Sequence, residues 1–190
     1  MRIIGGKLKN KKLEFPKNLI TRPLKDSVRE NIFNILRHSN NFDVDIKKSY
    51  VLDVYAGTGS FGLECVSREA SKVVFVENDM GAIKNLKENI KNLNCEDKTL
   101  LILDDVLKSF NLKYLDLYKK KFDIIFFDPP YKDEKFIEII KKMKKEDLIN
   151  KKNIIILHRE KNTEGQIENY LNIVENRIYG RSEIFFGKFF

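Results

Sequence analysis

The sequence contains no tryptophan, only two cysteines and two histidines, and no long apolar run. A structural zinc site needs four clustered Cys or His ligands, so the scattered Cys65 and Cys95 predict free thiols in a reducing compartment and no metal site. No segment approaches the roughly 20 apolar residues that span a bilayer, and the first ten residues lack the apolar centre of a secretory signal. These absences favour a cytoplasmic protein that does not span a membrane.

The positive charge of the chain is concentrated near its N-terminus. The 190 residues are 42% hydrophobic, enough for one domain with its own core, and the formal net charge is +8. Before Asp26 one acid, Glu14, stands against eight basic residues, which are Arg2, Lys7, Lys9, Lys11, Lys12, Lys17, Arg22 and Lys25. Such a basic arm suits a phosphate backbone, although a solvated lysine-rich surface is the alternative.

Strand-like and helix-like segments alternate along the rest of the chain. Apolar patterning predicts buried strands at 50–54, 72–77, 99–103, 122–127 and 153–158. Helices are predicted from 26 to about 39 and at 61–68, 80–93, 134–145 and 163–170, with a helical and loop connection over 106–121. Two further strands, 173–179 and 184–189, are too close for a crossover and should pair antiparallel.

This order predicts an α/β fold with a seven-stranded, mostly parallel sheet. Helices should cover both faces, and the sheet should end in a C-terminal antiparallel hairpin. Residues 2–13 read as short extended pieces around Gly5 and Gly6, which would make a small N-terminal extension. We therefore divide the chain into a basic arm, residues 1–25, for substrate docking and a catalytic domain, residues 26–190.

A glycine loop follows the first predicted strand and opens a helix. Gly57, Gly59 and Gly62 match G-x-G-x-x-G, a spacing that lets backbone amides approach a ligand at a helix N-terminus. Glu77 closes the second strand, where an acid would accept both ribose hydroxyls of an adenosine cofactor. Asp53 and Ala56 precede the first glycine, a form that looks like the first motif of S-adenosylmethionine methyltransferases rather than a dinucleotide site.

The tetrapeptide Asp128-Pro129-Pro130-Tyr131 follows the fourth strand, at the sheet edge where open α/β sheets bind ligands. Two prolines cannot donate hydrogen bonds, so the loop presents carbonyl oxygens and a carboxylate as acceptors. An exocyclic amine of a base has two donor hydrogens that fit those acceptors, and Tyr131 offers a flat face to a base outside its stack. A rigid Pro-Pro turn with an incidental Asp is the alternative.

These motifs together resemble one family. The chain is similar to the bacterial RsmD-like 16S ribosomal RNA guanine-N2 methyltransferases, nearly end to end. The matching segments are RIIGG at 2–6, TRP at 21–23, DSVRENIFN at 26–34, the 53–62 loop, Glu77, DPPY at 128–131 and Tyr179-Gly180. Leu24, Ser27 and the lysine-rich 9–13 segment depart from the family pattern, which bears on substrate docking more than on chemistry.

The resemblance implies a Rossmann-like class I methyltransferase fold and methyl transfer from S-adenosylmethionine to the N2 amine of a guanine in small-subunit ribosomal RNA, in an assembled or partly assembled particle. The residues it assigns to catalysis are Asp128, Pro129, Pro130 and Tyr131. Those assigned to the cofactor are Asp53, Tyr55, Ala56, Gly57, Thr58, Gly59, Glu77, Asn78, Asp105, Val106 and Asp128. Those assigned to RNA are Arg2, Lys7, Lys9, Lys11, Lys12, Arg22 and Arg29.

Several assignments have alternatives. Arg29 could instead pair within its helix with Asp26 or Glu30, and Asp104 competes with Asp105 for the cofactor. His38 and His158 are interpreted as structural, although His158 ends a strand on the ligand side. The enzyme is expected to be a monomer. Rival functions are methylation of an amine in DNA, another RNA, a small molecule or a protein, and a non-catalytic RNA-binding assembly role.

Overall fold

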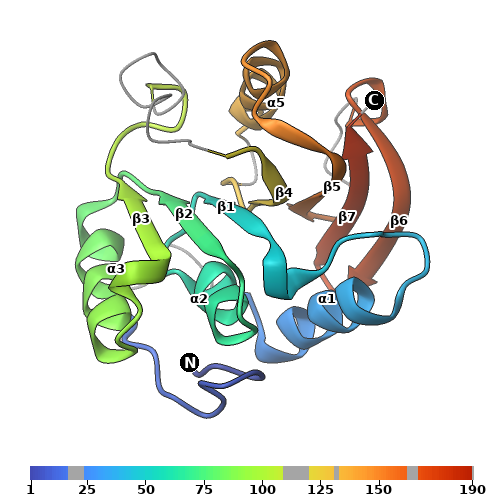
Figure 1. The fold of residues 1–190 in the computed structure, drawn as a ribbon. Helices are drawn as coiled ribbons and strands as arrows, with labels where there is room; N and C mark the ends of the chain where they lie inside the picture. The colour runs from blue at the N-terminus through green and yellow to red at the C-terminus, as the bar shows by residue number, and fades with distance from the viewer. Residues whose placement is uncertain (17–23, 109–119, 131–132, 162–166, 190) are drawn as a thin grey trace.

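Seven strands of the described chain form one sheet, in the order β3-β2-β1-β4-β5-β7-β6 (Figure 1). The computed structural model describes residues 1–16, 24–108, 120–130, 133–161 and 167–189. The strands are β1 Tyr50–Val54, β2 Lys72–Val76, β3 Thr99–Ile102, β4 Phe122–Phe127, β5 Ile149–Glu160, β6 Leu171–Tyr179 and β7 Ser182–Phe189. The helices are α1 Asp26–His38, α2 Ser60–Ser67, α3 Met80–Asn92 and α5 Lys135–Lys145, with 3₁₀ turns η1 Ile46–Lys48, η2 Glu96–Lys98 and η4 Ile167–Asn169.

The strand directions confirm the predicted fold class. Strands β1 to β5 pair in parallel, and β7 pairs antiparallel with both β5 and β6. The chain runs outward from β1 through β2 to β3, and then returns to pair β4 with the other side of β1. Ligands of open α/β sheets bind at the carboxyl ends of strands where the order reverses, which here lies between β1 and β4.

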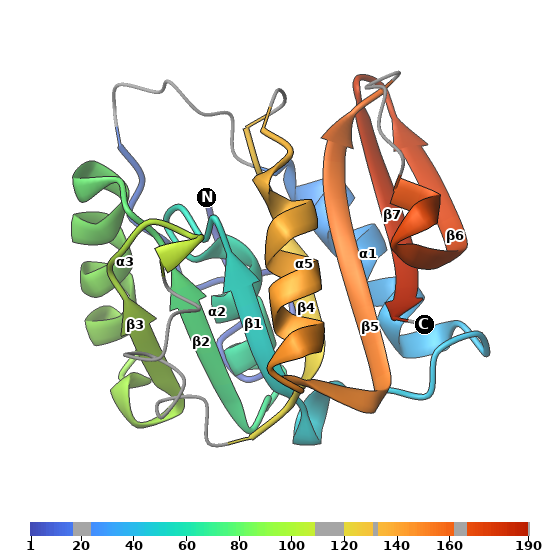
Figure 2. The same cartoon turned by 90° about the horizontal axis from the view of Figure 1, so that it is seen from above.

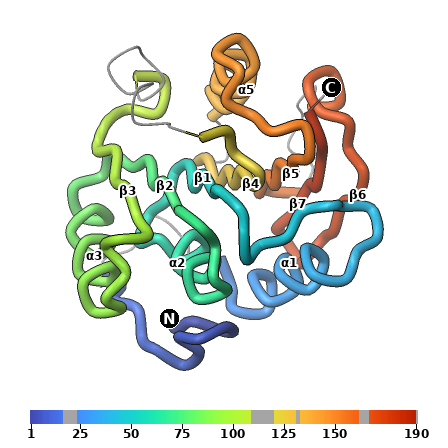
Figure 3. Tube along the Cα trace, viewed as in Figure 1, coloured from blue at the N-terminus to red at the C-terminus, as the bar shows by residue number. Residues whose placement is uncertain are grey.

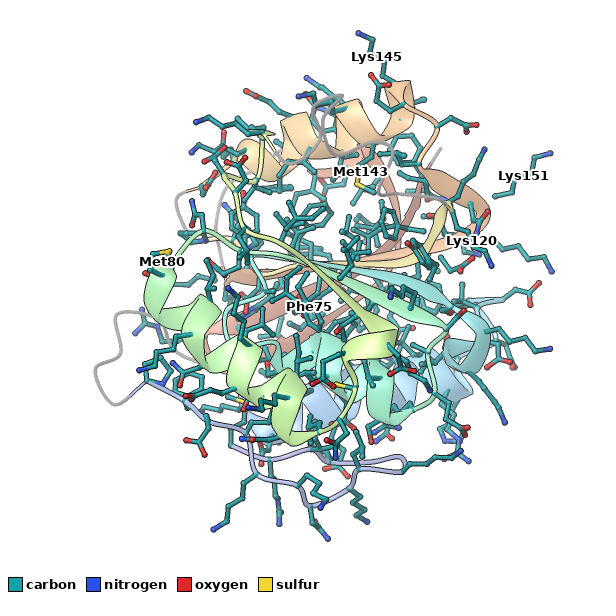
Figure 4. All side chains as sticks on the ribbon, turned by 60° about the vertical axis from the view of Figure 1, so that its left-hand side comes forward. Phe75, Met80, Lys120, Met143, Lys145 and Lys151 are labelled. Atoms are coloured by element: carbon teal, nitrogen blue, oxygen red, sulfur yellow. The ribbon has the colours of Figure 1, made fainter. Side chains whose placement is uncertain are left out.

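Helices cover both faces of the sheet because successive strand residues point to opposite sides. Along β2, Val73 and Phe75 join the core under α1, α2 and α3, whereas Val74 joins the core under α5. Figure 2 shows α5 crossing one face of the sheet, with α2 and α3 on the other. Figure 4 shows Phe75 and Met143 within these two layers. The core therefore has two halves, divided by the sheet.

Most predicted element bounds agree with the structure to within two residues, and β5 is the main exception. The strand begins at Ile149, four residues before the predicted start, because Phe122 of β4 already pairs with Ile149 across an irregular register. The helix predicted over 163–170 appears, in its described part, only as the 3₁₀ turn Ile167–Asn169. Most of the predicted 106–121 connection lies outside the described residues.

The N-terminal segment, residues 1–16, folds back on itself and lies against α2 (Figure 3). Arg2 and Lys12 form an antiparallel bridge, and the Ile3 amide donates to the Lys11 carbonyl at 2.9 Å. The buried Glu64 carboxylate on α2 accepts the Ile4 and Gly5 amides, each at 2.8 Å. The extended pieces predicted around Gly5 are thus hydrogen-bonded to the domain.

No helix in the described parts of the chain is long and apolar enough to cross a membrane.

Candidate functional site

The loop after β1 is organised by Asp53, which is buried on that strand. Asp53 Oδ2 accepts the Gly62 amide of α2 at 2.8 Å, and the Ala56 amide donates to the Val76 carbonyl of β2 at 3.1 Å. The loop is therefore tied to the helix that follows it and to the neighbouring strand. Ala56 and Thr58 are buried within it, and Tyr55 is half-buried.

Two glycines in this loop have different physical roles. Gly57 has φ +56°, a conformation that side chains rarely adopt, and a Cβ at this position would meet no atom within 4 Å. That side of the loop is open and can receive a ligand. Gly62 instead lies so close to β2 that a Cβ would come 2.3 Å from the Phe75 ring, so this glycine permits close packing of helix on sheet.

Glu77 lies at the carboxyl end of β2, beside the glycine loop. Its Oε2 accepts the Gly57 amide at 2.7 Å, and its Oε1 accepts the Asn78 and Asp79 amides, each at 2.8 Å. A carboxylate offers about four acceptor sites, so three are used by the backbone. Ribose hydroxyls would have to share this carboxylate with the amides, a condition that the sequence did not reveal.

Two of the predicted cofactor residues, Asp105 and Val106, lie after β3. Asp105 Oδ1 accepts the Leu107 amide at 3.0 Å, and its Oδ2 lies 4.0 Å from Lys135 Nζ. Val106 is buried, whereas Asn78 is exposed. Asp104 Oδ1 accepts the Asp105 amide at 2.8 Å, so the two acids form one turn and the choice between them stays open.

The site is rich in negative charge. Burial raises the pKa of Asp53 well above its usual range, and the carboxylates of Asp128 and Glu77 raise it further, against the lowering effect of the Gly62 amide. Three carboxylates that repel one another beside an open glycine loop favour a cationic ligand. S-adenosylmethionine carries a sulfonium and an ammonium group, so these residues fit the expected cofactor.

Asp128 follows β4 at the edge where β1 also ends. Its Oδ1 lies 2.7 Å from Nδ1 of His158 on β5, and the imidazole is only 5% exposed. Its Oδ2 has no hydrogen-bond partner in the described part of the chain, and the side chain is 29% exposed. One oxygen is therefore held by the protein, and the other can accept a hydrogen bond from a substrate.

The acceptor loop is residues 128–133, between β4 and α5, and its described residues are Asp128, Pro129, Pro130 and Asp133. Pro129 is buried and Pro130 is exposed, while Tyr131 lies outside the described residues. The Asp133 amide donates to the Pro130 carbonyl at 2.8 Å, and the Asp133 carbonyl accepts from Arg159 at 2.7 Å. Tyr55 Oη lies 3.5 Å from Asp133 Oδ2, where burial and the nearby carboxylates of Asp133 and Asp105 raise the pKa of the phenol. The cofactor loop and the acceptor loop thus meet.

One predicted RNA contact does not fit the structure. Arg29 on α1 is fully buried, and its guanidinium donates to the Arg2 carbonyl at 2.6 Å and to Asp26 Oδ1 at 2.9 Å. A side chain enclosed in this way does not reach a phosphate. The intrahelical pair with Asp26, the alternative left open by the sequence, is the interaction that forms.

The other predicted RNA residues that the structure describes are all exposed. Lys7 pairs with Glu69 at 2.7 Å and Arg2 with Asp26 at 3.8 Å. Lys9, Lys11 and Lys12 are exposed and form no ion pair with any residue that the structure describes. Arg22 lies outside the described residues.

Sequence reasoning missed several residues that hold the site together. Asn89 of α3 is buried and donates to the Thr58 carbonyl at 3.1 Å, and Arg159 and Asp133 support the acceptor loop. Asn89 interrupts the apolar face of α3, and Arg159 follows His158 at the end of an apolar strand. A polar residue within an apolar face of a helix or strand indicates a buried hydrogen bond, because a buried polar group needs a partner.

Comparisons with known proteins agree with this geometry. A family model described as Conserved hypothetical protein 95 matches residues 1–188. A protein of Haemophilus influenzae named ribosomal RNA small subunit methyltransferase D is 35% identical over 133 residues, 69% of this chain and 64% of that protein. A Buchnera aphidicola protein of the same name is 32% identical over 160 residues, covering 84% and 78%. The solved structure of the Escherichia coli protein yhhF has a TM-score of 0.78 at 24% identity, covering 100% of this chain and 97% of that one.

Proposed function

Because the chain belongs to the family described as Conserved hypothetical protein 95, we propose that it is an S-adenosylmethionine-dependent methyltransferase that acts on small-subunit ribosomal RNA. The proposed acceptor is the exocyclic N2 amine of one guanine. The family resemblance predicted from the sequence motifs is confirmed by the family match, and the fold is that of class I methyltransferases. The chain spans just under two thirds of the H. influenzae relative and 78% of the B. aphidicola one.

The observation that carries the proposal is the arrangement of Asp128. Its Oδ1 is held by His158, and its Oδ2 stands beside two residues, Pro129 and Pro130, that cannot donate a hydrogen bond. The loop after β1 is adjacent, because Val54 pairs with Phe127, the residue before Asp128. An acceptor for an amine and an open glycine loop with clustered carboxylates therefore share one edge of the sheet.

This arrangement can support methyl transfer to nitrogen. S-adenosylmethionine, when bound, supplies a methyl group on a positively charged sulfur. Asp128 accepts a hydrogen bond from the amine, which orients the nitrogen and stabilises the positive charge that develops on it. As the nitrogen–carbon bond forms and the methyl–sulfur bond breaks, with the neutral thioether as leaving group, Oδ2 can hold the proton that the nitrogen releases. Asp53 and Glu77 orient the cofactor through the glycine loop.

The basic arm supplies the proposed contact with RNA. Lys9, Lys11 and Lys12 form no ion pair with any described residue and can each neutralise a phosphate. Contacts between lysines and RNA phosphates do not distinguish one nucleotide from another. We therefore propose that the substrate is an assembled or partly assembled ribosomal particle, whose structure determines which guanine is methylated. We further propose that the protein acts as a monomer in the cytoplasm.

The test is methyl transfer from labelled S-adenosylmethionine to unmethylated small ribosomal subunits, naked small-subunit RNA and duplex DNA in parallel. The product is digested, and its nucleosides are identified by mass spectrometry. Asp128→Asn and Asp128→Ala are the variants, and calorimetry measures cofactor binding, since the chain has no tryptophan to serve as a fluorescent probe. The expected product is N2-methylguanosine, absent in both variants while the cofactor still binds.

Label in duplex DNA, or in another nucleoside, would refute the substrate assignment and leave the fold intact. An Asp128→Ala variant that restores ribosome assembly in a deletion strain would favour the non-catalytic assembly role.

A further inference from the structure

The described residues at the start of the loop that carries Asp128 form few backbone hydrogen bonds. Pro129 and Pro130 have no amide hydrogen, and the Asp128 amide reaches the Val54 carbonyl only at 3.4 Å. A carboxylate on such a loop needs support from another element if its oxygens are to keep one orientation. That support comes from two successive residues at the carboxyl end of β5.

The first of these residues is His158. Phe127 of β4 pairs with Leu157 of β5, and this register places Asp128 and His158 side by side. Nδ1 of His158 lies 2.7 Å from Asp128 Oδ1. An ionised carboxylate can only accept a hydrogen bond, so Nδ1 must carry the proton in this pair. The imidazole is 5% exposed, which fixes the ring and, through it, the carboxylate.

The second residue is Arg159, whose side chain leaves β5 on the other face. It donates to the Asp133 carbonyl at 2.7 Å, and its guanidinium stacks over the Phe136 ring of α5 at 5.2 Å. Asp133 is tied back to the loop through the Pro130 carbonyl. His158 therefore holds the beginning of the acceptor loop, and Arg159 holds its end.

We propose that His158 and Arg159 form a clamp on the acceptor loop and act as positioning residues for methyl transfer. His158 orients the Asp128 carboxylate so that Oδ2 faces the substrate amine. Arg159 fixes the end of the loop at Asp133. This inference rests on the proposed function, because it assigns Asp128 to the acceptor amine. Neither residue contacts the substrate. Their effect reaches the reaction through the orientation of one carboxylate.

The kinetic test compares His158→Leu with His158→Asn. The Asn side-chain amide can place a donor near the position of Nδ1, whereas Leu cannot. We expect His158→Leu to lower kcat on the order of 10- to 100-fold, as misplacement of a reacting group does, with the dissociation constant for S-adenosylmethionine and the unfolding midpoint unchanged. His158→Asn should recover most of this activity. Arg159→Met, which keeps packing against Phe136 but removes the donor, should also lower kcat.

The matched control is His38→Leu, because His38 is the second of the two histidines and lies exposed at the end of α1. The clamp is refuted if His158→Leu keeps the wild-type kcat, or if the kcat of His158→Asn falls as far as that of His158→Leu while both variants bind the cofactor and melt normally.

A second measurement needs no substrate. With only two histidines in the chain, side-chain nitrogen NMR can assign the His158 ring directly. We expect Nδ1 to be protonated in the wild type and to lose this preference in Asp128→Ala. A wild-type ring protonated only on Nε2 would overturn the inference. If the wild type methylates no RNA but Nδ1 is protonated, the proposed function fails and the His158–Asp128 pair stands.

Discussion

The side-chain amide of Asn89 on α3 pairs with the backbone of Glu14 as a strand residue would. Oδ1 accepts the Glu14 amide at 2.6 Å, and Nδ2 donates to the Glu14 carbonyl at 3.1 Å. The same Nδ2 also donates to the Thr58 carbonyl in the glycine loop at 3.1 Å. One buried amide thus joins the N-terminal segment to the predicted cofactor loop.

Replacing the Asn89 side-chain amide should destabilise the attachment of both the N-terminal segment and the glycine loop. Asn89→Ala leaves the Glu14 amide and the Thr58 carbonyl without their buried partner, which costs about 1–3 kcal/mol of unfolding free energy. Denaturant unfolding measures the change, and hydrogen exchange should quicken at Glu14. Asn92→Ala, at the exposed end of the same helix, is the control and should change stability little. Equal stability of both variants would show that the Asn89 bonds contribute nothing.

The exposed lysines of the N-terminal segment should control the salt dependence of RNA binding. Changing Lys9, Lys11 and Lys12 together to Gln should reduce the steepness of log affinity against log salt by about 0.7 to 0.9 for each phosphate that is no longer neutralised. Filter binding to small-subunit RNA at several salt concentrations measures this slope.

The matched control changes Lys120, Lys145 and Lys151 to Gln. These lysines, labelled in Figure 4, are also exposed and lie where β4 and β5 begin and α5 ends. Asp128 instead follows the last residue of β4. Their replacement should leave the slope near that of the wild type. If the two triple variants change the slope equally, RNA binding is general rather than centred on the arm.

Glu64 should anchor the N-terminal segment to α2. Its carboxylate accepts the Ile4 and Gly5 amides and the Arg68 guanidinium, and it is fully buried. In Glu64→Gln the side-chain NH2 group, a donor, faces backbone amides or a guanidinium that are also donors. We therefore expect the free energy of unfolding to fall by about 2–4 kcal/mol, as measured by denaturant unfolding. The exposed Glu88→Gln is the control. Equal unfolding midpoints for the two variants would argue against the anchor.

Asp53 should make stability depend on pH. Burial raises the pKa of Asp53, so the folded state retains a proton that the unfolded chain releases above about pH 3.9. Without cofactor, the wild type should therefore lose stability as pH rises from this value through the raised pKa. Asp53→Asn has no such proton, so its stability relative to the wild type should increase over that window and then level off.

Thermal melts from pH 4 to pH 9, at roughly unit intervals, measure this difference. The same variant should bind S-adenosylmethionine more weakly by calorimetry, because the site has lost one negative charge. A stability difference that does not vary with pH would mean that the pKa of Asp53 in the folded state is not raised above its value in the unfolded chain.

Local patterns in the sequence predicted where much of the candidate site lies in the chain. The G-x-G-x-x-G spacing after an apolar strand placed Gly57 and Gly62, and the acid at the end of the next strand placed Glu77. These features depend on residues close together in the chain. The burial of Arg29 could not be predicted in the same way, because Arg2 and Asp26 reach it from the folded N-terminal segment and from its own helix.

The sequence by itself determined the alternation of strands and helices, the parallel sheet with its terminal hairpin, and the order of the two motifs. Periodicity and turn residues act over a few positions, so they can be read directly. Only the tertiary structure decided which polar groups meet across the sheet edge. The register of β4 against β5 joins Asp128 to His158 across 30 positions, and α3 joins Asn89 to Glu14 across 75. Such pairs form because buried polar groups must find partners, and the fold alone determines which partners lie within reach.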